Sequence, residues 1–187
     1  MYYWKILFTF IVLLFSITAR AEQDTEEDFG VADPEHIEFN QFEYMRGKWI
    51  IDMQMSDDEG QFQKLPNQAF VHGFYHSDGR SFQTVFTTED GFFSTDIRAY
   101  NFEMKKWQIM FLNATAQRWH QFEASYLDNQ MTTIIPGGYS GKEEFDIKAI
   151  DRDITKDGYI KHVYYSYDGG LNWSKKYIMS ASRLGSR

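Results

Sequence analysis

Short strand-like runs separated by turn signals fill the chain from Trp49 onward, and this pattern constrains the fold more than any other feature. The runs recur about every 8 to 12 residues, a spacing typical of a β-sandwich or β-barrel. No stretch of ten residues after Gly47 has helical periodicity. The expected strands lie near 48–55, 67–76, 80–88, 92–101, 106–113, 118–126, 130–136, 143–151, 159–167 and 172–183.

The apolar pattern within the strands favours a closed barrel. Trp107, Ile109 and Phe111 alternate with Met110 and Leu112, so both faces of this strand are apolar. Such a strand is buried on both sides or lines a cavity. Consecutive hairpins without helices between them fit an up-and-down barrel, in which closure removes unpaired strand edges. The sequence therefore predicts an all-β fold, a single antiparallel up-and-down β-barrel of about 8–10 strands.

The first residues have the pattern of a secretory signal peptide. Lys5 precedes the apolar run Ile6–Thr18, and Ala19-Arg20-Ala21 has the small-x-small form of a cleavage site. The run is shorter than the roughly 20 apolar residues that a spanning helix needs. We therefore expect a signal peptide at 1–21, cleavage after Ala21, no membrane span afterwards, and a periplasmic or secreted protein.

Composition limits the partners of the remaining 166 residues. They carry 17 basic and 27 acidic side chains, a net charge of −10. An acidic surface repels phosphate backbones, so nucleic acid is not an expected partner. The chain has no cysteine, hence no disulfide, which favours a bacterial periplasm over an animal secretory route.

The segment before the first strand divides into two parts. Residues 22–35 contain seven acids and no base, which predicts an acidic, disordered lead-in. Within 33–47, Pro34 suits the first turn of a helix and Gly47 suits its end, so a short N-terminal helix is expected. No low-complexity segment or linker follows, and 36–187 is expected to form one barrel domain.

Four motifs occur in an order that resembles a known family: "RGKW", "DGRSFQTVF", "DIRAYNFEMKKW" and "YYSYDGGLNW". The segment from Glu38 to Arg183 resembles the secreted bacterial lipocalin-like proteins grouped as a domain of unknown function. The resemblance implies a calycin-type barrel with an internal cavity, and no established reaction. It also implies that Trp49 of the Gly47-x-Trp49 motif closes the barrel floor, with Arg183 packed over it.

The stretch "SYDGGLNW", Ser166 to Trp173, is close to the Asp-box pattern of sialidase propellers. A single copy in 166 residues cannot build a six-bladed propeller of four-stranded blades. We therefore expect a hairpin, with Asp168 capping the turn amides and Trp173 packed beneath, in preference to a glycosidase site.

The histidines are poor candidates for a metal site. His72 and His76 lie roughly 13 Å apart on one strand, too far to share an ion. No cysteine and no H-E-x-x-H pattern is present, so no metal is expected. Calycin-like folds can hold haem through one histidine, for which His162 or His120 is the candidate. The alternative for each is a hydrogen-bonded or exposed ring.

Arg98 and Glu123 are charges in the middle of expected strands. A charge inside a barrel is costly unless it is paired. The two side chains either point outward or orient a polar ligand group within the cavity, where they would pair with each other. The full set of candidate ligand-binding residues is Arg98, Trp107, Met110, Trp119, Glu123 and Tyr164.

These observations favour an exported lipocalin-like protein that binds a small apolar or aromatic ligand in its barrel. One alternative is an enzyme on the same scaffold, using His120 and Glu123 in acid–base chemistry. Positions 120 and 123 fall on opposite faces of a regular strand, which weakens that alternative. Another is an interaction module with a filled core. The sequence leaves the ligand and the oligomeric state open.

Overall fold

The computed structural model describes residues 29–140 and 143–185. In these residues a short 3-10 helix, η2 (Ile37–Met45), precedes eleven strands. The strands are β1 (Gly47–Ser56), β2 (Phe62–Lys64), β3 (Ala69–Tyr75), β4 (Ser81–Thr88), β5 (Phe93–Asn101), β6 (Lys106–Asn113), β7 (Arg118–Leu127), β8 (Gln130–Ser140), β9 (Glu143–Arg152), β10 (Gly158–Ser166) and β11 (Ser174–Arg183). No helix within this part of the chain is long and apolar enough to cross a membrane.

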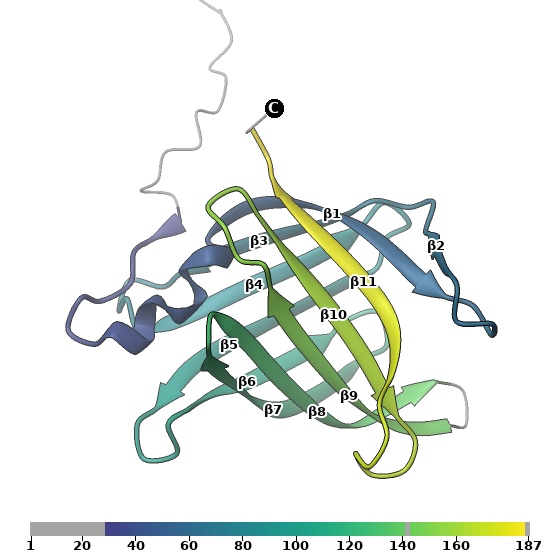
Figure 1. The fold of residues 1–187 in the computed structure, drawn as a ribbon. Helices are drawn as coiled ribbons and strands as arrows, with labels where there is room; N and C mark the ends of the chain where they lie inside the picture. Colours follow the sequence, from purple (N-terminus) through teal and green to yellow (C-terminus); the bar gives the residue numbers. More distant parts are fainter. Residues whose placement is uncertain (1–28, 141–142, 186–187) are drawn as a thin grey trace, which may run out of the picture.

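Ten of the strands close into an antiparallel barrel (Figure 1). From β3 to β11 each strand pairs with the next in the chain, and β1 pairs with both β3 and β11. The short β2 pairs only with the end of β1, outside the ring of ten. The predicted up-and-down lipocalin-like barrel is confirmed. The strand that the sequence pattern missed, β2, has three residues, too few to show an alternation.

Helix η2 covers one end of the barrel, which we call the closed end (Figure 1). Its Phe42 ring stacks on Phe82 and meets Trp107 edge to face, with ring centroids 5.7 and 4.9 Å apart. The helix approaches β3 at Gly73, where a Cβ atom would lie 2.2 Å from the carbonyl oxygen of Met45. Only glycine permits this contact, so Gly73 lets the helix seal the end of the barrel.

Trp49 lies at the centre of the closed end with 1% of its surface exposed. Its indole N–H donates to the carbonyl of Met45 at 2.9 Å, and the Arg183 guanidinium lies 4.3 Å from its ring centroid. Arg183 also donates to the carbonyl of Arg46 at 2.9 Å. Gly47 has φ 108°, and a Cβ there would lie 2.6 Å from Arg183 Nη1. This is the arrangement that the resemblance implied for Gly47, Trp49 and Arg183.

The expected lead-in is folded in the part that the structure describes. The Phe29 side chain is buried, and the backbone N–H of Asp33 donates to the carbonyl of Gly79 at 2.8 Å. Arg80 Nε donates to the Asp33 carboxylate at 2.8 Å. The domain thus includes residues 29–35, and the boundary expected after 35 is wrong because burial and ion pairing anchor this segment. The expected signal peptide and residues 22–28 lie outside the described residues.

The Asp-box-like stretch forms the turn between β10 and β11. The Asp168 carboxylate accepts hydrogen bonds from the Ser166 hydroxyl at 2.7 Å and from the Asn172 backbone N–H at 2.9 Å. The Asn172 bonds, followed by that of Ser166, lower the pKa of Asp168 to about 2. Trp173 is half-buried, with Lys148 Nζ 4.4 Å from its ring centroid. The stretch therefore has the hairpin geometry that the sequence predicted.

Truncation of Trp49 is expected to weaken the whole barrel. Trp49→Ala should lower the free energy of unfolding by about 3–5 kcal/mol, because it empties a large core site. The measurement is urea unfolding followed by circular dichroism. Trp119→Ala is the matched control, since the Trp119 side chain is 67% exposed and should cost less than about 1 kcal/mol. Equal effects of the two changes would contradict this account of the closed end.

Candidate functional site

The barrel contains a cavity of about 360 Å³ above the closed end. Strand side chains alternate between the two faces of a barrel wall, so one face of each strand lines this space. The lining is mainly apolar and comes from every strand of the barrel except β7. Its apolar members are Met45, Ile51, Met53, Val71, Phe86, Phe92, Phe111, Ile135, Ile147, Ala149, Val163 and Met179.

A buried ion pair forms part of the cavity floor. Arg98 is inside the barrel, and its Nε and Nη2 atoms donate to the two carboxylate oxygens of Asp96 at 2.7 and 2.8 Å. The Thr84 hydroxyl accepts from Arg98 Nη2 at 3.0 Å and donates to Asp96 at 2.8 Å. The bidentate geometry fixes both charged groups and offsets the cost of removing them from water.

The surroundings of Arg98 keep it charged. Burial opposes the charged form, but the charge and hydrogen bonds of Asp96 outweigh burial, so the pKa of Arg98 is raised. The guanidinium lies 4.2 Å from the ring centroid of Phe42 and donates to the sulfur of Met45 at 3.4 Å. Two residues of η2 thus pack directly under the cation.

A second ion pair comes from β9 and β10. Lys161 Nζ lies 3.2 Å from Asp151 Oδ1, without the direction of a hydrogen bond. The Tyr44 hydroxyl donates to the other Asp151 oxygen at 2.7 Å. Burial, followed by the Asp151 charge, raises the pKa of Tyr44, which therefore stays a neutral donor. Lys161 lines the cavity beside Tyr159.

The floor is polar but balanced in charge. Arg98 and Lys161 face Asp96 and Asp151, so two cations meet two carboxylates. Lys161 keeps ammonium N–H donors beyond its contact with Asp151, because an ammonium group carries three. In 29–140 and 143–185, no three His, Asp or Glu side chains come together in a way that could hold a metal ion. This arrangement suits hydrogen bonding to a neutral polar group under an apolar wall.

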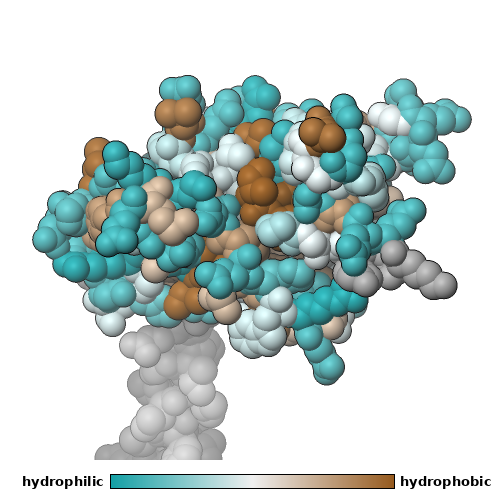
Figure 2. All heavy atoms as spheres, turned by 90° about the horizontal axis from the view of Figure 1, so that it is seen from below, coloured by the Kyte–Doolittle hydropathy of each residue, from teal (hydrophilic) through white to brown (hydrophobic). Residues whose placement is uncertain are grey.

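The barrel wall is incomplete beside the cavity. The β7–β8 ladder ends at Glu123 and Ile134, although β7 begins at Arg118. Beyond a bulge between Ile135 and Gly138, β8 continues only along β9. β7 and β8 lie on the lower side in Figure 1, and Figure 2 shows that face from below: hydrophobic surface fills a recess between hydrophilic side chains.

Two of the six candidate ligand-binding residues lie inside the barrel. Arg98 lines the cavity as part of its floor. Trp107 is fully buried at the closed end, where its indole N–H donates to Gln41 Oε1 at 2.9 Å. Trp107 is therefore a core residue below the cavity and is not among the residues that line it.

The other four candidates lie on the outer face of the wall. Met110 and Trp119 are 44% and 67% exposed. Glu123 pairs with Lys106 at 2.7 Å, and the Tyr164 ring lies 5.4 Å from Lys148 Nζ. The expectation that these four line the cavity is wrong, because strand register turns their neighbours inward. The expected Arg98–Glu123 pair is wrong for the same reason.

The two histidines proposed for haem or acid–base chemistry lie on different sides of the wall. His120 pairs in register with Phe111, a cavity residue, and so faces inward near the incomplete wall. His162 follows the inward Lys161 and faces outward, where burial and then the charge of Lys175 lower its pKa. His120 and Glu123 are on opposite faces and form no catalytic dyad.

Sequence reasoning missed most of the polar floor. Asp96, Thr84, Asp151, Lys161 and Tyr44 were not among the candidates. One signal was present, because Ser94, Asp96 and Arg98 alternate along β5, as polar residues on one face do. The Lys161–Asp151 pair had no comparable local signal, because its members come from different strands.

Comparisons with known proteins support the fold. No model of a known protein family matches the sequence, and no curated protein is similar to it. An S-type phycobiliprotein lyase from Guillardia theta has a similar structure, with a TM-score of 0.54 and 10% identity over 83% of this chain and 99% of that chain. A structure of EF1p2_mFAP2b bound to DFHBI aligns over 78% of this chain and 98% of that chain, with 13% identity. Its TM-score of 0.37 is too low to indicate a shared fold. The likeness to the lyase concerns the fold alone, which is an antiparallel up-and-down barrel of lipocalin-like form.

Removal of Arg98 should expose the cost of an unpaired charge. Arg98→Met is expected to lower the free energy of unfolding by about 3–5 kcal/mol, because the Asp96 carboxylate would remain buried without its cation. The double variant Arg98→Met with Asp96→Asn should recover much of this loss. Urea unfolding of both variants and of Asp96→Asn completes the cycle. A purely additive result would show that the two side chains are not coupled.

Proposed function

We propose that this protein is exported and that its barrel binds a small apolar or aromatic molecule that carries a neutral polar group. The observation that carries the proposal is the cavity of about 360 Å³, with an apolar wall and a charge-balanced polar floor. Pockets of this kind obtain affinity from apolar contact and orientation from a few polar groups.

The polar floor indicates that the polar end of the ligand lies deepest in the cavity. A carbonyl or hydroxyl oxygen can accept from the Lys161 ammonium without disturbing the Arg98–Asp96 pair. A fully charged group would upset the balance between two cations and two carboxylates, at a cost beneath a mainly apolar wall. The likeness to a phycobiliprotein lyase supports the scaffold alone, since the two chains are only 10% identical.

A neutral hydrophobic dye tests the cavity. N-phenyl-1-naphthylamine should bind saturably, with a rise in fluorescence on entering an apolar site. Val163→Trp places a large side chain in the cavity and should weaken binding at least about tenfold, or about 1.4 kcal/mol. The adjacent Tyr164→Trp is the matched control, since Tyr164 faces outward and its exchange should leave the affinity unchanged.

Either of two results would contradict the proposal: no saturable binding, or equal affinity in both tryptophan variants. Thermal unfolding of each variant shows whether the barrel is intact. Native mass spectrometry of protein purified from its own host should then reveal the mass of a retained ligand.

Export has its own test. The apolar run Ile6–Thr18 and the Ala19-Arg20-Ala21 pattern support cleavage after Ala21. Sequencing the N-terminus of protein recovered outside the cytoplasm should begin at Glu22. A membrane-bound product that retains Met1 would contradict the proposed export.

A further inference from the structure

The floor of the barrel cavity contains a primary amine. Among the described residues that line the cavity, Lys161 alone has an amino group. Arg98, the other cation of the floor, is held by two hydrogen bonds to Asp96. A guanidinium is always charged in proteins and has no lone pair with which to attack a carbonyl carbon. Lys161 is therefore the amine nucleophile of the cavity.

Lys161 lies between the ligand space and a buried carboxylate. Lys161 and Asp151 are direct partners in the β9–β10 register, with Nζ 3.2 Å from Asp151 Oδ1. The Lys161 side chain is 24% exposed and lines the cavity, whereas the Asp151 side chain is 2% exposed and is not among the lining residues. A ligand in the cavity therefore meets the amine first, with the carboxylate behind it.

The two oxygens of Asp151 have different surroundings. Oδ2 accepts a hydrogen bond from the Tyr44 hydroxyl at 2.7 Å. Oδ1 is buried and accepts no hydrogen bond from the part of the chain that the structure describes. Tyr44 thus fixes the carboxylate and leaves Oδ1, the oxygen beside Lys161, able to exchange protons at short range.

We propose that Lys161 captures an apolar aldehyde in the cavity as a protonated imine, with Asp151 as proton carrier and counter-ion. This inference rests on the proposed function and narrows the neutral polar group of the ligand to an aldehyde carbonyl. An aldehyde carbon carries one substituent besides hydrogen. It can therefore reach Nζ between Tyr159 and Met179, which line the cavity on either side of Lys161.

The capture is a condensation in which water leaves. Lys161 gives one ammonium proton to Asp151, and the neutral amine attacks the carbonyl carbon. A C–N bond forms, and the carbonyl π electrons move to the oxygen, which takes the proton from Asp151. Asp151 then takes a second proton from the nitrogen and passes it to the hydroxyl group, which leaves as water while the nitrogen lone pair forms the C=N bond.

The reaction leaves the charge of the floor unchanged. The ammonium carries one positive charge before the reaction and the iminium carries one after it, so two cations still face two carboxylates. Pairing with Asp151 offsets the cost of holding the iminium away from water. The apolar wall holds the ligand and displaces water from the imine carbon, which slows hydrolysis.

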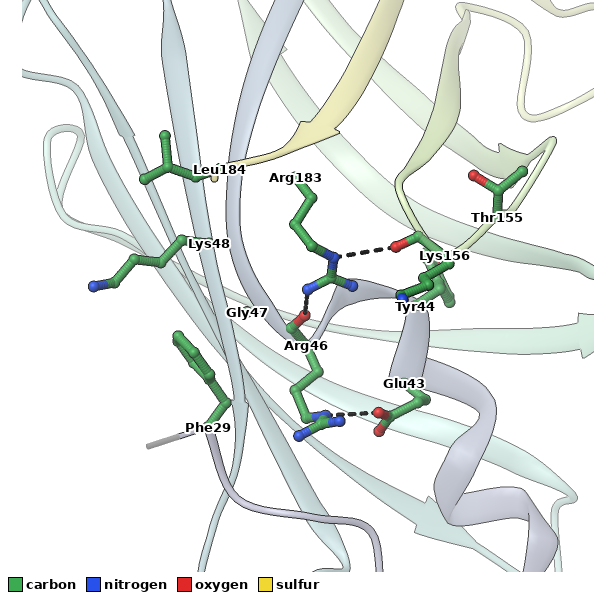
Figure 3. Close-up of a pocket in the computed structure, with 10 residues that line it drawn as sticks. All are labelled: Phe29, Glu43, Tyr44, Arg46, Gly47, Lys48, Thr155, Lys156, Arg183 and Leu184. Carbon is green, nitrogen blue, oxygen red and sulfur yellow. Dashed lines mark hydrogen bonds and ion pairs between the residues drawn. The ribbon is translucent and has the colours of Figure 1, made fainter. Parts of the chain in front are cut away.

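A second pocket provides a lysine for comparison (Figure 3). This pocket, of about 420 Å³, lies outside the barrel at the closed end and includes Lys156 in its lining. Lys156 is exposed, and its carbonyl accepts a hydrogen bond from Arg183 Nε at 3.1 Å. An imine on the exposed Lys156 amine would stay open to water and hydrolyse. Capture is therefore expected at Lys161 in preference to Lys156.

Reductive trapping with 2-naphthaldehyde tests the capture, because sodium cyanoborohydride reduces an imine to a stable amine. The intact mass should rise by one naphthylmethyl group, and tandem mass spectrometry should place that group on Lys161. Lys161→Arg keeps a cation beside Asp151 without an amine, so labelling should fall at least about tenfold. Lys156→Arg is the matched control and should be labelled like the unaltered chain.

Two further measurements test the chemistry of the site. Asp151→Asn should slow labelling of Lys161 at saturating aldehyde at least about tenfold, because the proton carrier is lost. An unchanged rate in a folded Asp151→Asn variant would overturn the role of Asp151. 2-Naphthalenemethanol, which has the same rings but no carbonyl, should compete with the labelling and leave no adduct.

Dye binding separates this inference from the proposed function. Saturable binding of N-phenyl-1-naphthylamine without labelling of Lys161 would overturn the capture and leave the apolar cavity standing. Labelling spread over exposed lysines, as in the chain unfolded in urea, would overturn it as well. Absence of saturable dye binding would contradict the proposed function, and the capture with it. Mapping the adduct on the unaltered chain keeps the test decisive if Lys161→Arg does not fold.

Discussion

The contact between Trp49 and Arg183 joins the first and last strands of the barrel, and the rest of the structure depends on it. The two residues are partners in the β1–β11 register, and the guanidinium lies over the indole ring. Both also hold the end of η2, through the carbonyls of Met45 and Arg46. One cluster thus closes the sheet and anchors the helix that covers its end. Without closure, β1 and β11 would expose unpaired edges.

The cavity follows from how that end is filled. Aromatic rings of Phe42, Phe82 and Trp107 occupy the barrel next to η2, and Arg98 lies directly over Phe42. The next layer of the barrel holds the two ion pairs of the cavity floor, Arg98–Asp96 and Lys161–Asp151. The strands that carry these side chains hold the partners at fixed distances. Beyond that layer the lining is mainly apolar and leaves a hollow. The β7–β8 ladder ends beside this hollow, so an unpaired part of the wall adjoins the space proposed for the ligand.

Charged and aromatic residues lie on both faces of the barrel wall, but their surroundings differ. Inside, Arg98 is neutralised by Asp96 at bonding distance. Outside, Glu123 meets Lys106 and Tyr164 lies near Lys148, where water screens the charges. Both faces are rich in apolar residues, so hydrophobicity alone does not distinguish them. This explains why Met110 and Trp119 matched the pattern expected of a cavity although they face solvent.

The sequence by itself determined the strand segments, the hairpin at Asp168, the barrel class and, through resemblance, the roles of Gly47 and Trp49. These features are encoded locally, because turn residues and a period of two act within a few positions. Only the tertiary structure decided which face of each strand points inward, since a register shift of one residue exchanges the faces. It also decided that Lys161 meets Asp151 and that residues 29–35 pack on the barrel, because those contacts join segments distant in the chain.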